Sequence, residues 1–146
     1  MVEFKRYPGI DVDGKAVLIT VASGPVIVRE GKVLLDMHGD DPFWKFPGGR
    51  VRDDESLQAT AKREAAEEVG LTDLELHGQP VVLTFERDRD GTREVVTLYH
   101  YWATTKMEPV KQRDVRELAW HEIDALPANC APNIQPVMRA FQRMGK

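Results

Sequence analysis

The chain has 146 residues, of which 42% are hydrophobic and 30% are charged, a composition typical of a globular protein rather than of a disordered or fibrous one. Its formal net charge of −4 argues against a broad nucleic-acid-binding face, because such faces gather Lys and Arg against the phosphates. We therefore expect no nucleic-acid partner, and the length predicts a single domain over residues 1–146.

The N-terminal ten residues carry charges and lack the apolar stretch of a signal peptide, and no apolar run is long enough to span a bilayer. The single cysteine, Cys130, cannot form an intrachain disulfide, and a small semi-apolar filler is a better interpretation of it than a nucleophile. These features predict a cytoplasmic protein without a membrane partner, and we expect a monomer or a homodimer.

The first predicted element is a strand over 16–21, where β-branched residues are frequent. The apolar runs 26–28 and 33–35 flank the polar residues 29–32, which predicts two strands joined in a hairpin. The segment 40–52 is dense in Pro and Gly and predicts a loop.

Good helix formers dominate 55–69, so we expect a helix over this segment. Asp53, Asp54 and Ser56 are candidates for its N-cap, and Gly70 stands where a left-handed residue would end it.

Strands are expected at 81–85 and 94–103, on either side of a polar turn at 88–91, followed by a short strand at 118–120 and a helix over 133–144. Strands on both sides of one helix, with a second helix at the end, predict a mixed α/β layer fold.

Three carboxylates fall on one face of the first predicted helix. Glu64, Glu67 and Glu68 stand at i, i+3 and i+4 and repel one another at this spacing. A hard divalent cation such as Mg²⁺ would relieve the repulsion, since it takes oxygen ligands and shares its remaining positions with phosphates. Considered alone, the triplet is more simply a solvated surface, and Gly48-Gly49 a turn.

The residues are more specific in combination. Gly49, Glu55 and the run Arg63-Glu64-Ala65-Ala66-Glu67-Glu68-Val69-Gly70-Leu71 have the spacing GX5EX7REUXEEXGU, where U is a bulky aliphatic residue. This pattern is the Nudix box, and every fixed position matches, although Ala65 is smaller than is usual at its U position. The flanking segments 44–48, 118–120 and 123–127 are also similar to the family. The chain therefore resembles the Nudix hydrolases of MutT type.

The resemblance implies an α/β/α sandwich, with a mixed β-sheet between the box helix and the terminal helix. It also implies an activity, the metal-dependent hydrolysis of a phosphoanhydride bond in a nucleoside diphosphate linked to another group, with water attacking phosphorus. The expected partner is a small nucleotide, and the expected cofactor is Mg²⁺, with Mn²⁺ as an alternative.

Site residues follow from the same resemblance. The implied metal ligands are Glu64, Glu67, Glu68 and the carbonyl oxygen of Gly48. Glu55 and Arg63 match the pair that orients the loop over the helix, and a forked hydrogen bond between them would suit this role. An ordinary surface ion pair would contribute little instead.

Other residues are candidates for contacts with the substrate. Gly49, Arg50 and Arg52 follow the loop and are expected to touch phosphate oxygens, unless the two arginines are merely solvated charges. Asp114 and Glu117 lie in the later loop from which some family members take a general base, although both are more simply solvated charges.

An asparagine contacts the base in MutT-type members, and Asn129 or Asn133 would match it. The alternative is that Asn133 caps the terminal helix and Asn129 belongs to a turn. Segment 85–88 lacks the downstream Pro or Tyr that marks ADP-ribose and diadenosine polyphosphate hydrolases, which favours a nucleoside triphosphate. The four histidines show no metal-ligand spacing and are expected to be surface or strand residues: His38, His77, His100 and His121.

Two other classes stay open at this point. One is a Nudix-fold binding or regulatory module without catalysis, which the intact glutamate set disfavours. The other is an isoprenoid diphosphate isomerase of the same fold, which needs a Cys and Glu pair that the sequence does not place.

Overall fold

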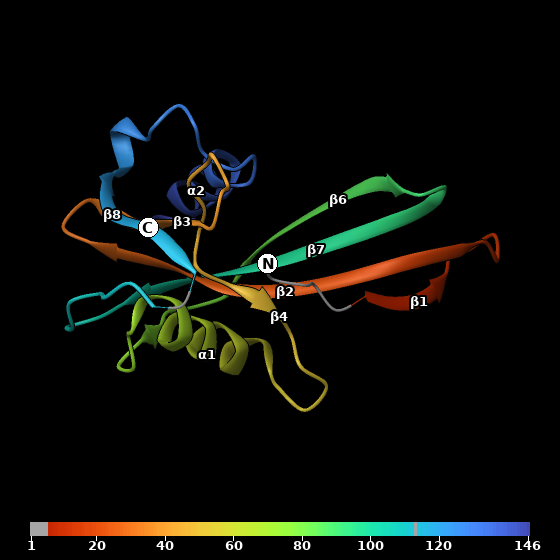
Figure 1. Cartoon of the computed structure of the whole chain (residues 1–146), viewed down its shortest axis with the longest axis horizontal. Helices are drawn as coiled ribbons and strands as arrows, with labels where there is room; N and C mark the ends of the chain where they lie inside the picture. The colour runs from red at the N-terminus through yellow and green to blue at the C-terminus, as the bar shows by residue number, and fades with distance from the viewer. Residues whose placement is uncertain (1–5, 113) are drawn as a thin grey trace.

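The structure is a computed structural model that describes residues 6–112 and 114–146. Eight strands, two α-helices and one 3₁₀ turn at Ile123–Ala125 make up the described chain (Figure 1). The strands are β1 (Arg6–Ile10), β2 (Ala16–Arg29), β3 (Lys32–His38), β4 (Gly49–Arg50), β5 (Glu75–Leu76), β6 (Val81–Arg89), β7 (Thr92–Thr104) and β8 (Val115–Glu122). The helices are α1 (Leu57–Val69) and α2 (Ile134–Arg143).

The strands form one mixed sheet. Its main path runs β5-β7-β2-β3-β8, while β1 and β4 also pair with β2, and β6 pairs with the far side of β7. The central pair β2·β7 is parallel, and the other pairs are antiparallel. Because α1 and α2 cover opposite faces of this sheet (Figure 1), the predicted α/β/α sandwich is confirmed. Neither described helix combines the length and the apolar character that a crossing of the bilayer requires.

Successive side chains of a strand point to opposite faces of the sheet, so the core strands pack alternate residues against α1 and α2. One cluster lies under α1 and consists of Ile27, Leu34, Ala65, Val69, Leu71, Leu74 and Ala103. The other lies under α2 and consists of Val26, Val33, Leu35, Phe46, Ile134, Val137, Met138 and Phe141. Ala65, the small residue of the box, is therefore a fully buried contact between α1 and the sheet.

The box helix begins at Leu57, two residues after the predicted start. Of the three N-cap candidates, Ser56 takes the position, and its side chain accepts a hydrogen bond from the backbone N–H of Ala59 at 3.0 Å. Gly70 ends the helix with φ of +68°, the left-handed conformation that was predicted for it. Glu55 therefore lies before the helix, where its carboxylate can bind other groups.

The strand predictions were correct in place but too short. Segments 16–21 and 26–28 belong to one continuous strand, β2, and β8 extends the predicted 118–120 in both directions. The β2–β3 hairpin was predicted, and its turn residues Glu30 and Gly31 have φ values of +50° and +77°. β1, β4 and β5 were not predicted, since a short edge strand has too few residues to show an alternation.

Gly24 brings β2 into contact with the loop that follows β3. An alanine Cβ at position 24 would lie 2.2 Å from the carbonyl oxygen of Pro47 and 2.8 Å from Cα of Gly48. Only a residue without a side chain allows this approach. The middle of the sheet thus fixes the position of the glycine loop.

One half of the sheet extends beyond the two helices (Figure 1). This extension, which we call the arm, consists of β1, residues 16–20 of β2, residues 85–89 of β6 and residues 92–96 of β7. The other half, which we call the body, carries the helices and the glycine loop. The candidate site therefore lies in the body and not in the arm.

Candidate active site

Backbone hydrogen bonds hold the glycine loop on two sides. Asp36 and Lys45 exchange N–H···O bonds of 2.9 Å, which ties the start of the loop to β3. Trp44 donates its N–H to the carbonyl oxygen of Asn129 at 2.8 Å, and Gly49 pairs with Ser23 of β2. The loop is therefore anchored before and after Gly48.

Two glutamates of α1 reach the two glycines of this loop. The carboxylate of Glu68 accepts a hydrogen bond of 2.7 Å from the backbone N–H of Gly48. The carboxylate of Glu64 lies so close to Gly49 that an alanine Cβ there would stand 2.6 Å from its Oε1. Both glutamates are buried, with exposed fractions of 7% for Glu64 and 3% for Glu68. Buried carboxylates beside the backbone of a glycine turn are a feature of cation sites.

Arg63 links Glu55 to the rest of the box. Its guanidinium donates to Glu55 from Nε at 2.6 Å and from Nη2 at 2.9 Å, which is the forked bond expected of this pair. The Arg63 bond, opposed by burial, lowers the pKa of the Glu55 carboxyl to about 2. Arg63 also donates to Glu64 at 2.8 Å, to Glu67 at 3.0 Å and to the carbonyl oxygen of Arg50 at 3.1 Å. It thereby joins the loop, the helix start and two of the predicted metal ligands.

The structure brings some of the other candidates near the box. Nη2 of Arg52 lies 3.9 Å from Oε1 of Glu67, and the side chain of Arg50 is exposed beside the loop. Asp114 and Glu117 are both exposed, and neither side chain is hydrogen-bonded or ion-paired to a described residue. Their carboxylates therefore make no hydrogen bond or ion pair with the glutamates of α1.

The two asparagines have different environments. The side chain of Asn129 donates to the carbonyl oxygen of Pro42 at 3.1 Å, so it fastens the loop before the glycines. Asn133 stands at the N-cap of α2 but makes no capping hydrogen bond. Its amide lies instead 3.0 Å from Nε2 of His100 on β7.

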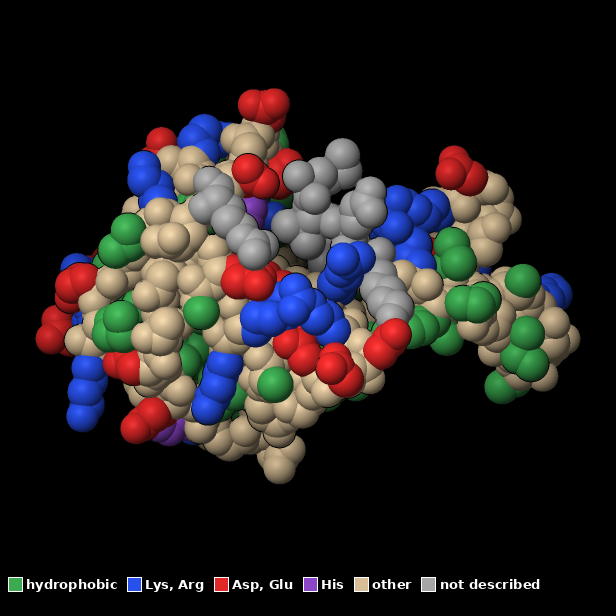
Figure 2. All heavy atoms as spheres, turned by 60° about the horizontal axis from the view of Figure 1, so that its bottom comes forward, with side chains coloured by type: hydrophobic (Ala, Val, Ile, Leu, Met, Phe, Trp, Pro, Cys, Tyr) green, Lys and Arg blue, Asp and Glu red, His purple; other side chains and the backbone are tan. Residues whose placement is uncertain are grey.

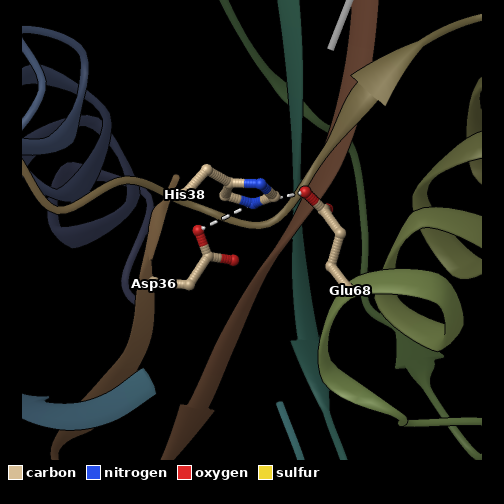
Figure 3. A group of neighbouring side chains, drawn as sticks. All are labelled: Asp36, His38 and Glu68. Carbon is tan, nitrogen blue, oxygen red and sulfur yellow. Dashed lines mark ion pairs between the residues drawn. The ribbon is translucent and has the colours of Figure 1, made fainter. Parts of the chain in front are cut away.

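A buried triad of titratable side chains lies against the box and was not predicted. Figure 3 shows the ring of His38 between Asp36, which also comes from β3, and Glu68 of α1. Nε2 of His38 lies 2.7 Å from Oε1 of Glu68 and 3.2 Å from Oδ1 of Asp36. Asp36 is fully buried. His38 does lie in a strand, as expected, but the absence of a ligand spacing hid its contact with the box.

The surroundings raise the pKa values of two groups of the triad, Glu68 and His38. Burial, against the opposing contact with His38, raises the pKa of the Glu68 carboxyl to about 7. Burial alone would lower the pKa of His38, but its contacts with Asp36 and Glu68 outweigh burial and raise that pKa to about 9. With all three groups ionised the triad carries a net negative charge inside the protein, which is costly unless a cation compensates it.

The alternation of β3 is the signal that could have identified this triad. Leu34 faces α1, so Asp36 and His38, two and four residues later, continue the same face of the strand. An aspartate at the next inward position of a buried strand has no simple structural explanation. Its partner could not be read from the sequence, because Glu68 reaches it from another element.

The donor set fits a divalent cation once His38 loses its proton, because a metal takes the neutral imidazole. Asp36, His38 and Glu68 each offer a ligand atom within 4.8 Å of the others. Oε1 of Glu68 and both carboxylate oxygens of Asp36 are buried, and within the described ranges none has a donor in hydrogen-bonding geometry. Buried oxygens in this state are suited to a metal ion. Figure 2 shows the wider setting, with acidic and basic side chains side by side on the face that carries α1.

Comparisons with known proteins agree with this geometry. An "8-oxo-dGTP diphosphatase" of Buchnera aphidicola is 40% identical over 63 residues, which are 43% of this chain and 39% of that relative. An "RNA pyrophosphohydrolase" of Acidiphilium cryptum is 27% identical over 134 residues, with 79% of this chain and 82% of the relative covered. The crystal structure of a MutT NUDIX hydrolase from Burkholderia pseudomallei superposes with a TM-score of 0.63 at 25% identity, over 83% of this chain and 96% of that chain.

The first of these relatives is matched over less than half of its length, so it supports the family more than the substrate. The family model described as the NUDIX domain matches residues 18–141, a range that contains the glycine loop, the whole box, α1 and all but the last two residues of α2. The chain therefore belongs to the Nudix hydrolase family.

Proposed function

We propose that the protein is a Mg²⁺- or Mn²⁺-dependent pyrophosphohydrolase that cleaves a phosphoanhydride bond of a nucleoside diphosphate linked to another group, such as a nucleoside triphosphate. The proposal rests mainly on the contacts of the Glu64 and Glu68 carboxylates with the consecutive glycines Gly48 and Gly49. Relatives that are named as a diphosphatase and a pyrophosphohydrolase support the type of reaction.

Glu64, Glu67, Glu68 and the carbonyl oxygen of Gly48 would hold the cation. When bound, it would screen the phosphate charges, polarise phosphorus and lower the pKa of a water molecule. Arg63 orients Glu64 and Glu67 by hydrogen bonds, and the N–H of Gly48 orients Glu68. The chain thus fixes its carboxylates by its own contacts.

The remaining residues position the substrate. The glycines let the backbone approach the phosphates closely, and Arg50 and Arg52 lie beside them with their side chains exposed to solvent. The water oxygen forms a bond to phosphorus, the bridging P–O bond breaks, and the leaving phosphate keeps the electron pair while the proton of water passes to a carboxylate. Such a reaction requires mainly positioning and charge neutralisation, and no nucleophilic Ser or Cys.

A panel of nucleoside triphosphates and dinucleoside and sugar-linked diphosphates tests this function. We expect pyrophosphate from the triphosphates and two phosphomonoesters from the linked diphosphates, and both reactions should stop when EDTA removes the metal. In oxygen-labelled water the label must enter one product phosphate. If no compound is consumed, the hydrolase proposal is refuted and a nucleotide-binding module replaces it. If turnover persists without metal, the proposed metal dependence is refuted.

Substitution of the carboxylates tests the assignment of ligands. Glu67→Gln and Glu68→Gln keep the size of the side chain but remove its charge, and we expect each to reduce turnover by roughly 10² or more, since a metal contributes several kcal/mol of charge stabilisation. Glu75→Gln, an exposed glutamate of β5, is the matched control. Near-normal turnover of the box variants at limiting Mg²⁺ would show that the ligands lie elsewhere.

We further propose Asn133, rather than Asn129, as the residue that contacts the base. Asn133 lines a hollow beside Gly48 and Gly49, while the side chain of Asn129 is occupied by the loop.

A further inference from the structure

The hollow beside the glycine loop lies on the α2 side of the sheet and has a volume of about 150 Å³. Phe46, Leu98, His100 and Asn133 are among the residues that line it, and the glycines form another part of its wall. A nucleotide whose phosphates reach Glu64 and Glu68 can therefore place its base in this hollow. This placement rests on the proposed function.

The hydrogen bonds of His100 fix its tautomer. Nδ1 lies 3.1 Å from the carbonyl oxygen of Val81, its neighbour across the β6·β7 pair. A carbonyl oxygen only accepts, so Nδ1 carries the proton. Burial lowers the pKa of His100 to about 4, against the opposing carbonyls of Val81 and Leu98, so the ring is neutral at physiological pH. Nε2 is therefore a lone-pair acceptor.

The tautomer of His100 in turn orients the amide of Asn133. An acceptor at Nε2 requires a donor, and only the NH₂ group of the asparagine can supply one across the 3.0 Å contact. The amide oxygen of Asn133 must then point away from His100. Within the described part of the chain no hydrogen bond engages this oxygen. It is available to a ligand in the hollow.

The backbone of Asn133 and the sequence of α2 both disfavour a capping bond. An N-cap residue is usually extended, but Asn133 has the helical φ of −82° and ψ of −15°. The third helical residue, a usual capping partner, is Pro136, which has no N–H. The ring of His100 is also held in place, because it packs edge-on against Phe46 with ring centroids 5.5 Å apart. A rigid acceptor thus faces an asparagine that does not cap its helix.

We propose that His100 is a positioning residue for base recognition, which locks the Asn133 amide with its oxygen toward the base. Without this lock the amide can rotate by a half-turn, which exchanges its oxygen and its NH₂ group. A base that matches one orientation then faces a donor where it needs an acceptor. His100 itself need not touch the substrate.

Nuclear magnetic resonance tests the lock without any turnover. Histidine side-chain ¹H–¹⁵N spectra of the intact chain should show His100 with its proton on Nδ1 and an unprotonated Nε2 from pH 5.5 to pH 8. Asn133→Ala should shift the Nε2 resonance, because it removes the donor. A proton on Nε2, or protonation of the ring above pH 6, overturns the proposal.

Kinetics test the consequence for specificity. For the four ribonucleoside triphosphates we measure the ratio of kcat/KM between the best and the worst substrate. His100→Phe keeps a ring against Phe46 but removes the acceptor, and we expect the ratio to fall about tenfold, mainly through KM, since a misoriented amide loses one hydrogen bond and leaves polar groups unpaired. His77→Phe, at a ring that bonds Thr104 instead, is the control and should keep the ratio.

A double-mutant cycle separates positioning from packing. If His100 acts through Asn133, the variant that combines His100→Phe with Asn133→Ala loses no more than Asn133→Ala alone. Additive losses, or an unchanged ratio in His100→Phe, overturn the proposal. Dissociation constants from calorimetry accompany the kinetics, so a chain that binds nucleotides without hydrolysing them refutes the proposed function and still tests His100. A chain that binds none refutes both.

Discussion

Glu55 and Arg63 form a contact that is more than a surface ion pair. The carboxylate accepts hydrogen bonds from Nε and Nη2 of Arg63, from the hydroxyl of Thr60 and from the backbone N–H of Arg52. Only 15% of the Glu55 side chain and 17% of the Arg63 side chain are exposed, so water competes weakly for these groups. The pair therefore clamps the loop before α1 to the middle of the helix.

Glu55→Gln should lower the free energy of unfolding at pH 7 by about 1–3 kcal/mol, the usual contribution of a hydrogen bond to a charged group. The pKa of Glu55 is lowered in the folded state, so its stabilisation is complete above 4.5 and disappears as the pH falls toward about 2. Urea unfolding at a series of pH values should show the two proteins converging in this range. Asp54→Asn, at an exposed neighbour, is the control. A gap that is constant down to pH 2.5 would contradict the clamp.

The elements of the box show what could be predicted and what could not. α1 was predicted nearly to its ends, because its cap, its helix formers and its closing glycine are local signals. The Glu55–Arg63 bond was predicted because both residues belong to one spaced motif. Asp36 and His38 were missed, since their meaning depends on the packing of β3 against α1, which no local pattern contains.

Substitution of Gly24 tests whether the glycine loop depends on its close contact with β2. Gly24→Ala would place a methyl group against backbone atoms of Pro47 and Gly48, which cannot move aside as a flexible side chain can. We expect a loss of about 1–3 kcal/mol in unfolding free energy, typical of overpacking, and a weaker affinity for Mn²⁺ measured by calorimetry. Gly9→Ala, whose nearest neighbour is the end of the Ile19 side chain, is the control. Unchanged Mn²⁺ affinity in Gly24→Ala would show that the loop does not depend on this contact.

At the scale of the whole molecule, the arm and the body are stabilised by different contacts. The arm lacks a helix above it, and Figure 2 shows hydrophobic side chains at its surface. Ile10 at the end of β1 and Val12 in the turn that follows are exposed. The interior contact of the arm is Glu94 of β7, which is fully buried and lies within 3.6 Å of arginines from the two outer strands, Arg6 of β1 and Arg87 and Arg89 of β6. One carboxylate therefore holds the outer strands to the centre of the arm.

Glu94→Gln should loosen the arm and leave the body intact. The arginines are between 26% and 43% exposed and can turn to water, so we expect a cost of about 1–3 kcal/mol rather than the larger cost of a fully buried charge. Hydrogen exchange should accelerate in β1 and β6 but not in α1. Glu86→Gln, an exposed residue of the same arm, should change neither. Uniform acceleration across both halves would mean that they unfold as one unit.

The parallel pairing of β2 with β7 has a consequence for the newly synthesised chain. One edge of β2 is shared in turn by β1, β4 and β3, all of which are made within a short stretch of sequence. Among the described residues, the other edge, from Val17 to Ile27, pairs with β7, whose residues 93–103 are translated much later. Until then the ribosome carries a chain with a long unpaired strand edge, which is the kind of surface that pairs with other chains. The interval between the synthesis of β2 and that of β7 is therefore when this protein most needs protection from aggregation.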